Sequence, residues 1–242
     1  MSPPEHFLFG ALAGTVIYTA QKKPGLVRWL GCCILTGTGS LAPDMDSGVS
    51  AYASANAWIG HRGWTHSLLF AALYGIVTAG GARLRNFKLM TPALVFACGF
   101  IGVCMHILGD FPTPPGSWGG LPVFFPHPAR FGGTGNIGWY NPVLFWKTSA
   151  FFAASALFVA AGLAAKGSFE RLRGALRILG GTIALGGFIF AALEIQASRY
   201  ADSVSWHAAQ ERQLKEMPWP VHPLTTELMQ VGMKIFARVR AH

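Results

Sequence analysis

Charged residues are scarce in this sequence. Aspartate, glutamate, lysine and arginine together make up 12% of the 242 residues, whereas hydrophobic residues make up 52%. This balance, with a mean hydropathy of +0.39, lies outside the usual range of soluble domains. The scarcity of charge therefore excludes an ordinary soluble domain and indicates a membrane protein.

Cysteine is also scarce. The four cysteines lie in apolar stretches and form no CxxC pair; they are Cys32, Cys33, Cys98 and Cys104. We interpret them as small buried hydrophobic residues, with a disulfide or a metal role as the lesser alternative.

Six apolar segments predict an all-α, polytopic helical membrane protein. Three uncharged runs, 64–81, 89–109 and 148–165, are close to the roughly 20 residues that a spanning helix needs. The run 178–193 is shorter and sharply bounded. Two further segments, 7–20 and 29–42, are expected to be tilted, partly embedded or shielded by neighbours. A signal peptide is the rival interpretation of the first segment, but Glu5 and His6 precede it rather than lysines, so we expect it to be retained.

Basic residues outnumber acidic ones by 19 to 10, and their distribution predicts an orientation. With the six segments placed in order, ten basic residues fall on one face: Lys22, Lys23, Arg28, Arg83, Arg85, Lys88, Lys166, Arg171, Arg173 and Arg177. Outside the C-terminal tail, the opposite face has only Arg62, Arg130 and Lys147. The positive-inside rule then places the first face in the cytoplasm and both termini outside it. The net charge of +9 is thus largely a topology signal with anionic lipid contact, and it requires no nucleic-acid partner.

Histidines and aspartates gather at helix ends that face the non-cytoplasmic side in this topology. There are four groups: His6, Asp44 with Asp46, His61 with His66, and His106 with Asp110. Ionisable residues at membrane depth are costly and favour a functional interpretation. The four-residue spacing of His106 and Asp110 places them on one helical face, where both can bind one ion.

Plainer interpretations of these groups remain open. The stretch 61–69 is also compatible with a helix N-terminus capped by Thr65. The stretch around Asp44 and Asp46 is compatible with a helix end followed by an aspartate turn. Arg62 is either a phosphate-binding residue or an arginine at the level of the lipid headgroups.

The same residues, in this order, resemble the bacterial inner-membrane YdjM-like family of metal-dependent hydrolases. The resemblance covers roughly residues 1–126 and rests on His6, the stretch LAPDMD ending at Asp46, the stretch HRGWTHS from His61 to Ser67, and HILGD ending at Asp110, followed by Thr113 and Pro114. The family is distantly similar to the zinc-dependent phospholipase C and nuclease superfamily. The resemblance implies a helical fold whose histidines and aspartates gather zinc and cleave phosphoesters. The stretch from Asp110 to Pro126 departs from the family pattern because it is a few residues longer, which leaves the substrate open.

We therefore expect a divalent-metal site without cysteine ligands, which suits zinc or manganese. The expected ligands are His6, Asp44, His61, His66, His106 and Asp110, and the expected catalytic residues are Asp46, His61 and Arg62. Because these are more ligands than one four-coordinate ion needs, one or two ions are expected. His127 is a candidate for a further ligand, but a histidine flanked by prolines in a loop is more often simply exposed.

Two domains are expected, a membrane-embedded hydrolase domain over 1–195 and a polar tail over 196–242 that ends in an amphipathic helix. The connection 111–142 has seven prolines and seven glycines and is expected to cover the metal site or to anchor aromatic residues at the interface. Gly10 and Gly14, and the glycine pairs at 180–181 and 186–187, are expected to allow close helix packing.

The sequence thus predicts an integral protein of the bacterial inner membrane that hydrolyses phosphoester bonds, with membrane lipids and a phosphoester or lipid-like substrate as its partners. The alternative is a non-catalytic metal-binding or metal-transport protein. A third interpretation is an ion that only joins helices. Ligands at helix ends favour the hydrolase, because transport ligands are expected near the membrane midplane.

Overall fold

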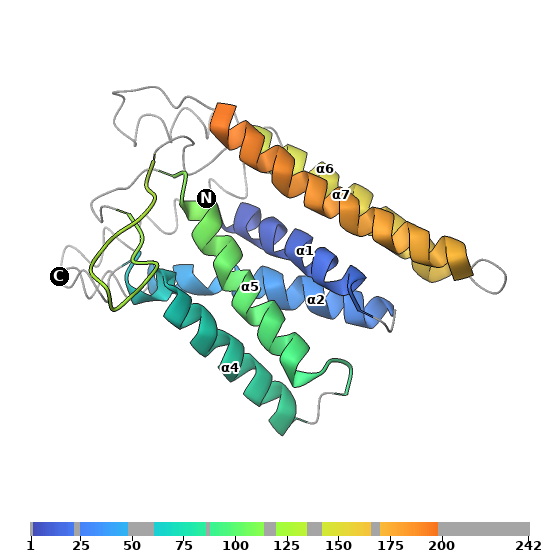
Figure 1. Ribbon diagram of the computed structural model, residues 1–242, viewed down its shortest axis with the longest axis horizontal. Coiled ribbons are helices and arrows are strands. Elements are labelled where there is room, and N and C mark those ends of the chain that lie inside the picture. The colour runs from blue at the N-terminus through green and yellow to red at the C-terminus, as the bar shows by residue number, and fades with distance from the viewer. Residues whose placement is uncertain are drawn as a thin grey trace, which may run out of the picture.

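The computed structural model describes residues 2–21, 25–47, 61–85, 88–113, 120–134, 142–165 and 170–197. In these ranges the chain is all-helical, and the isolated bridge between Leu121 and Phe131 belongs to no strand. The helices are α1 (Pro3–Thr19), α2 (Leu26–Gly39), η1 (Ala42–Met45), η2 (Trp64–His66), α4 (Leu68–Leu84), α5 (Pro92–Asp110), α6 (Pro142–Ala164) and α7 (Glu170–Ala197), as Figure 1 shows. The predicted all-α class is confirmed for this part of the chain.

Three segments are long and apolar enough to cross a membrane, namely Pro92–Asp110, Leu144–Ala164 and Leu172–Ala191. Helices α2 and α4 are apolar but shorter, with 14 and 17 residues. Candidate membrane spans are therefore present, whereas the six-segment topology and its orientation stay predictions.

Helix α4 begins later than the sequence predicts. The run 64–81 was expected to form one span, but its first three residues form the 3-10 helix η2, and α4 starts at Leu68. The cap is Ser67, whose hydroxyl oxygen accepts a hydrogen bond from the backbone N–H of Phe70 at 3.2 Å. The interpretation of Thr65 as the cap is therefore wrong. The break leaves His66 on a short irregular segment rather than on a spanning helix.

Helix α1 lies at the centre of the bundle and contacts α2, α5, α6 and α7. Its crossing with α2 depends on Gly10 and Gly14, because a Cβ at either position would collide with the backbone of α2 near Thr36 and Cys32. A Cβ at Gly102 of α5 would collide with the same carbonyl oxygen of Thr36 that Gly10 approaches. Small residues let these three helices approach closely, as is common between membrane helices.

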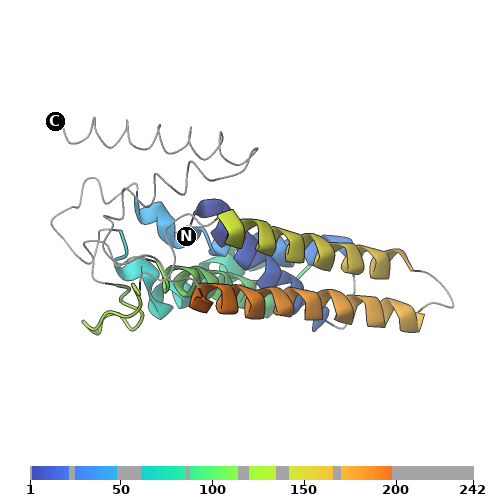
Figure 2. The same ribbon diagram turned by 90° about the horizontal axis from the view of Figure 1, so that it is seen from above.

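Helices α6 and α7 run side by side along one flank of the bundle (Figures 1 and 2). The hydroxyl of Ser155 donates a hydrogen bond to the carbonyl oxygen of Gly180 at 2.7 Å. Gly181 lies against Thr19 of α1, and Gly187 lies against Phe151. The predicted close packing is thus present at Gly180, Gly181 and Gly187, whereas a Cβ at Gly186 would meet its nearest neighbour, Phe151, only at 3.9 Å.

Part of the connection between α5 and α6 is described, over residues 120–134. Leu121 and Phe131 exchange backbone hydrogen bonds of 2.8 and 2.9 Å, which close this segment into a loop. The N–H of Leu68 donates to the carbonyl oxygen of Val123 at 2.9 Å, so the loop is attached to the start of α4. His127 is exposed on it. The tail predicted over 196–242 lies outside the described residues beyond Ala197, as do 114–119 and 135–141 of the connection.

Candidate metal centre

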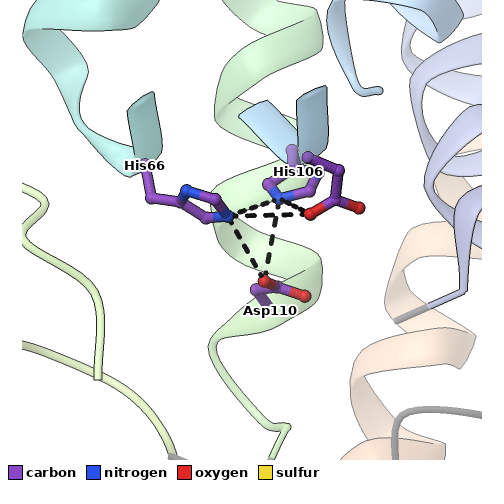
Figure 3. A group of neighbouring side chains, drawn as sticks. His66, His106 and Asp110 are labelled. Atoms are coloured by element: carbon purple, nitrogen blue, oxygen red, sulfur yellow. Dashed lines mark hydrogen bonds and ion pairs between the residues drawn. The ribbon is translucent and has the colours of Figure 1, made fainter. Parts of the chain in front are cut away.

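Four side chains from three separate segments meet at one end of the bundle. Figure 3 shows three of them, His66, His106 and Asp110, with dashed lines joining their polar atoms. Asp44 comes from η1, His66 from η2, and His106 and Asp110 from successive turns at the end of α5. Pro43 interrupts the helical run after α2, which allows Asp44 to turn toward α5. Residues far apart in the sequence therefore converge on one small volume.

The donor atoms of these four residues lie close together. The Nε2 atoms of His66 and His106 are 3.0 Å apart. The Asp44 Oδ1 atom is 3.8 Å from the first and 3.5 Å from the second. The Asp110 Oδ2 atom is 3.7 and 3.6 Å from the same two nitrogens. Donors bound tetrahedrally to a zinc ion at about 2.0–2.1 Å are about 3.4 Å from one another. The spacing of the group matches that arrangement.

Hydrogen bonds on the far side of each imidazole ring set which nitrogen carries the proton. The Nδ1 atom of His106 lies 2.8 Å from the carbonyl oxygen of Ser40, which can only accept, so Nδ1–H is the donor. The Nδ1 atom of His66 lies 3.1 Å from the hydroxyl oxygen of Thr65, whose own proton goes to Asp46. Nδ1 of His66 is therefore also the donor. In the neutral tautomers that these hydrogen bonds select, both Nε2 atoms carry lone pairs, and they lie 3.0 Å apart.

This arrangement fits a bound cation. Two nitrogen lone pairs at 3.0 Å repel each other, and two carboxylate oxygens lie beside them. A divalent ion between the four atoms would remove the repulsion and use every lone pair. Imidazole and carboxylate donors without thiolate suit zinc or manganese. The residues present thus fit the predicted metal, and its identity stays a prediction.

Asp46 contacts the Nδ1 atom of His66, on the side of the ring opposite the candidate centre, and it also contacts His61. Its two oxygens lie 2.8 Å from Nδ1 of His61 and 3.4 Å from Nδ1 of His66. Burial alone would raise the pKa of the Asp46 carboxyl, but the hydrogen bonds with the two histidines outweigh burial, and the pKa falls below its ordinary value. Asp46 is thus an ionised carboxylate at neutral pH. Carboxylate, histidine and metal in this order form a common supporting arrangement.

Burial dominates the protonation of His66. Removal from water lowers the pKa of this side chain to about 4, although the hydrogen bond with Asp46 acts in the opposite direction. The imidazole is therefore neutral at pH 7, which is the form that binds metals.

His6 and His61 lie beside the four-residue group rather than in it. The Nε2 atom of His6 is 3.2 Å from Oδ1 of Asp110, and its ring stacks on that of His106 with centroids 3.9 Å apart. Its Nδ1 atom is buried and has no hydrogen-bond partner in the described part of the chain. His61 forms a second group with Asp46 and His66, all of whose donor atoms lie within 4.8 Å of one another. His66 belongs to both groups, through opposite nitrogens of its ring.

Arg62 is buried against the group, with 2% of its surface exposed. One terminal nitrogen is 3.2 Å from Oδ2 of Asp110, and the same nitrogen donates to the hydroxyl of Thr113. The backbone of Arg62 has a φ of 59°, a left-handed conformation that non-glycine residues rarely adopt. Arg130 of the loop donates from its NH1 atom to the carbonyl oxygen of Arg62 at 3.1 Å. The loop thus supports the segment that carries the arginine.

The sequence did not indicate several supporting residues. Ser40 acts through its backbone carbonyl, which leaves no signal in the side-chain pattern. Thr65 was interpreted only as a helix cap, and Arg130 only as a topology residue. Thr113 was noted in a motif without a role, and in the structure it joins Arg62 to the end of α5 through a hydrogen bond to the Asp110 carbonyl at 2.7 Å. Only contacts in space assign these roles.

The region that contains the candidate metal centre matches a known protein family. The sequence profile described as YdjM inner membrane protein matches residues 1–193, which include every residue of the candidate metal centre. That description names a membrane location and no activity. No curated protein and no solved structure matches the chain.

Proposed function

The chain belongs to the YdjM inner membrane protein family, and from that premise we propose that it is a metal-dependent hydrolase of phosphoester bonds. The proposal rests on one observation. The Nε2 atoms of His66 and His106, which carry no proton in the neutral tautomers, lie 3.0 Å apart beside two carboxylates. Nitrogen and oxygen donors of this kind are typical of catalytic rather than structural zinc sites, which usually contain cysteine.

Exposure of the four ligands supports a site that a substrate can approach. The side chains of His66 and His106 are fully buried and that of Asp110 is 4% exposed, whereas that of Asp44 is 24% exposed. A substrate would therefore approach from the side of η1. A bound divalent ion supplies two kinds of chemistry, since it polarises a phosphoryl oxygen and acidifies water.

The residues around the ligands have separate tasks in this proposal. Asp46 and Thr65 keep the Nε2 lone pair of His66 directed at the centre. Arg62 places a positive charge 3.2 Å from a ligand oxygen of Asp110. Because Arg62 is buried, it can bind a phosphate oxygen only when the phosphate lies at the centre itself. His61, less buried than His66 and hydrogen-bonded to Asp46, is the candidate proton carrier.

A purely structural ion is the second candidate. It is favoured by the burial of three of the four ligands and by their origin on three separate segments, which an ion would join. The two functions differ in one property. A hydrolase needs a coordination position that exchanges with water, and a structural ion does not.

Metal content of detergent-purified protein tests the proposal first. We expect one or two equivalents of zinc or manganese in the wild type by mass spectrometry, and loss of at least one equivalent in His66→Ala and Asp44→Asn. His127→Ala is the matched control, because this histidine is exposed on the loop. Folding is compared by helical circular dichroism.

Activity is then measured with bis(p-nitrophenyl) phosphate as the probe. Hydrolysis that requires the metal and is lost in Asp44→Asn supports the hydrolase. A retained metal without hydrolysis of this or other phosphoesters supports the structural ion. Absence of metal, even after zinc or manganese is added back, overturns both functions.

A further inference from the structure

A groove between α2 and α4 lies near the end of these helices opposite to the metal centre. Both helices pack on α5 and make few contacts with each other. They approach where Gly39 faces the ring of Tyr74 and diverge from there, as Figure 1 shows. The space that opens has a volume of about 360 Å³, within the range of ligand pockets, roughly 300–1,000 Å³. Residues that form it include Gly31, Ile34 and Leu35 of α2, Gly81 and Arg85 from the end of α4, and Val95 of α5.

The groove is apolar and belongs to the hydrophobic surface of the membrane protein. Ile34 on its rim is 52% exposed, and Val77, one residue from the groove residue Thr78, is 71% exposed. A Cβ at Gly81 would meet no atom within 4 Å, so open space lies beside this groove residue. In a bilayer, lipid rather than water borders such a surface. The chemistry of the groove therefore fits a hydrocarbon chain.

Positive charge surrounds the end of the groove. Arg85 forms part of its wall. Arg28 in the first turn of α2, Arg83 in the last turn of α4 and Lys88 in the connection before α5 are further basic residues at this end of the helices. Arg28 also attaches the first turn of α2 to the connection before α5, since its Nε atom donates to the carbonyl oxygen of Leu89 at 3.0 Å. The sequence has no aspartate or glutamate over 21–43 or 47–109. The positive charge at this end is thus not offset by acidic residues of α2, α4 or α5 nearby.

We propose that the groove between α2 and α4 binds one acyl chain of an anionic phospholipid, whose phosphate is bound by Arg85. Arginine binds phosphate oxygens through paired N–H donors, and basic residues next to a membrane surface attract anionic lipids. A neutral lipid would fill the same groove without the attraction at its end. The site is independent of the proposed hydrolase, because it uses other residues at the other end of α4.

Lipid binding to full-length, delipidated protein in detergent tests the proposal. The probes are phosphatidylglycerol and phosphatidylcholine with identical acyl chains, and binding is measured by native mass spectrometry. We expect the wild type to prefer phosphatidylglycerol. Arg85→Ala should weaken phosphatidylglycerol binding roughly fivefold, the attraction of one basic residue, with little change for phosphatidylcholine. Arg83→Ala is the comparison variant, because Arg83 adds to the positive charge on the same turn but does not form the groove, so its loss should weaken phosphatidylglycerol binding less than Arg85→Ala does. An equal loss in the two variants would show general attraction to positive charge and would overturn the phosphate site at Arg85.

The acyl-chain part of the proposal has its own pair of variants. Gly81→Leu fills the groove and should weaken the binding of both lipids, whereas Gly80→Leu adds the same side chain outside it. Both positions have open space around them, so both variants are expected to fold. Equal effects of the two leucines would show that lipid binds the apolar surface in general and would overturn the groove. An unchanged headgroup preference in Arg85→Ala would overturn the role of this arginine.

Discussion

Asp46 supports the candidate centre without being one of its four closest ligands. It contacts Nδ1 of His66, while Nε2 of the same ring faces the centre. Asp46→Asn keeps the size of the side chain but removes the charge that holds the His66 ring. Loss of such a supporting carboxylate typically weakens metal binding by about 10–100-fold. We expect a decrease of this order in zinc affinity, measured by competition with a chelating dye.

The control for this variant is Met45→Ala. Met45 is the preceding residue in the chain, and its side chain is 78% exposed. The Met45→Ala variant should bind zinc with the same affinity as the wild type. Equal affinity of Asp46→Asn and wild type would contradict the supporting role and leave the contact with His66 as a packing feature.

The sequence identified the residues of the candidate centre. It did not indicate which of them lie close enough to share one ion. The order of His6, Asp44, His66, His106 and Asp110 along the chain was sufficient to group them. Which of these side chains extend to the centre was not predictable, because that depends on the distance of each side chain's polar atoms from the backbone of its own segment. His6, at the start of α1, reaches only Asp110 and the face of His106. Its predicted role as a direct ligand therefore stays a prediction.

At the scale of helices, glycine contacts determine how closely α1, α2 and α5 approach. A Cβ at Gly102 would lie 2.5 Å from the carbonyl oxygen of Thr36 and 2.9 Å from Cα of Gly39. These are backbone atoms, so no side-chain rotation removes the collision. We expect Gly102→Ala to lower stability by about 1–3 kcal/mol, the usual effect of overpacking. Thermal unfolding in detergent, followed by circular dichroism, measures the change.

Gly80→Ala on α4 is the matched substitution, because a Cβ there meets nothing within 4 Å. It should leave the unfolding temperature unchanged or raise it, since alanine favours helix by about 1 kcal/mol over glycine. If Gly102→Ala lost no more stability than Gly80→Ala, the close approach of α5 to α2 would not be the reason for glycine at position 102.

Helix positions were predictable from hydropathy, but helix ends were not. The run 64–81 contains no formal charge, so hydropathy alone extends the span through His66 and Ser67. The backbone instead changes direction, and Ser67 caps the new helix. A polar cap of this kind depends on a single hydrogen bond to Phe70, which an averaged hydropathy cannot detect.

For the whole molecule, a bound ion would join segments that are far apart in the sequence. The four candidate ligands come from η1, η2 and α5, so metal binding would stabilise the folded state and not the unfolded one. At a free metal concentration about 100 times the Kd, the expected gain is about 2.7 kcal/mol. Chelation should therefore lower the unfolding temperature of the wild type, and added zinc should restore it. His66→Ala should respond to neither treatment, and a wild type that is equally insensitive would argue against metal as a stabilising element.

The molecule as a whole was predictable in class and less so in arrangement. Low charge and long apolar runs were sufficient for an all-helical membrane protein, because hydropathy depends on composition. The divergence of α2 and α4, which opens the groove beside Arg85, arises from how both helices pack on α5. No periodicity within either helix contains that information.

The position of the ligands along the chain has a consequence for biosynthesis. All four lie between Asp44 and Asp110, and the loop residue Arg130 completes the support of Arg62. The ribosome therefore synthesises every donor atom before it reaches α6 at Pro142. For the proposed metal centre, ion binding would thus need no donor atom from α6 or α7.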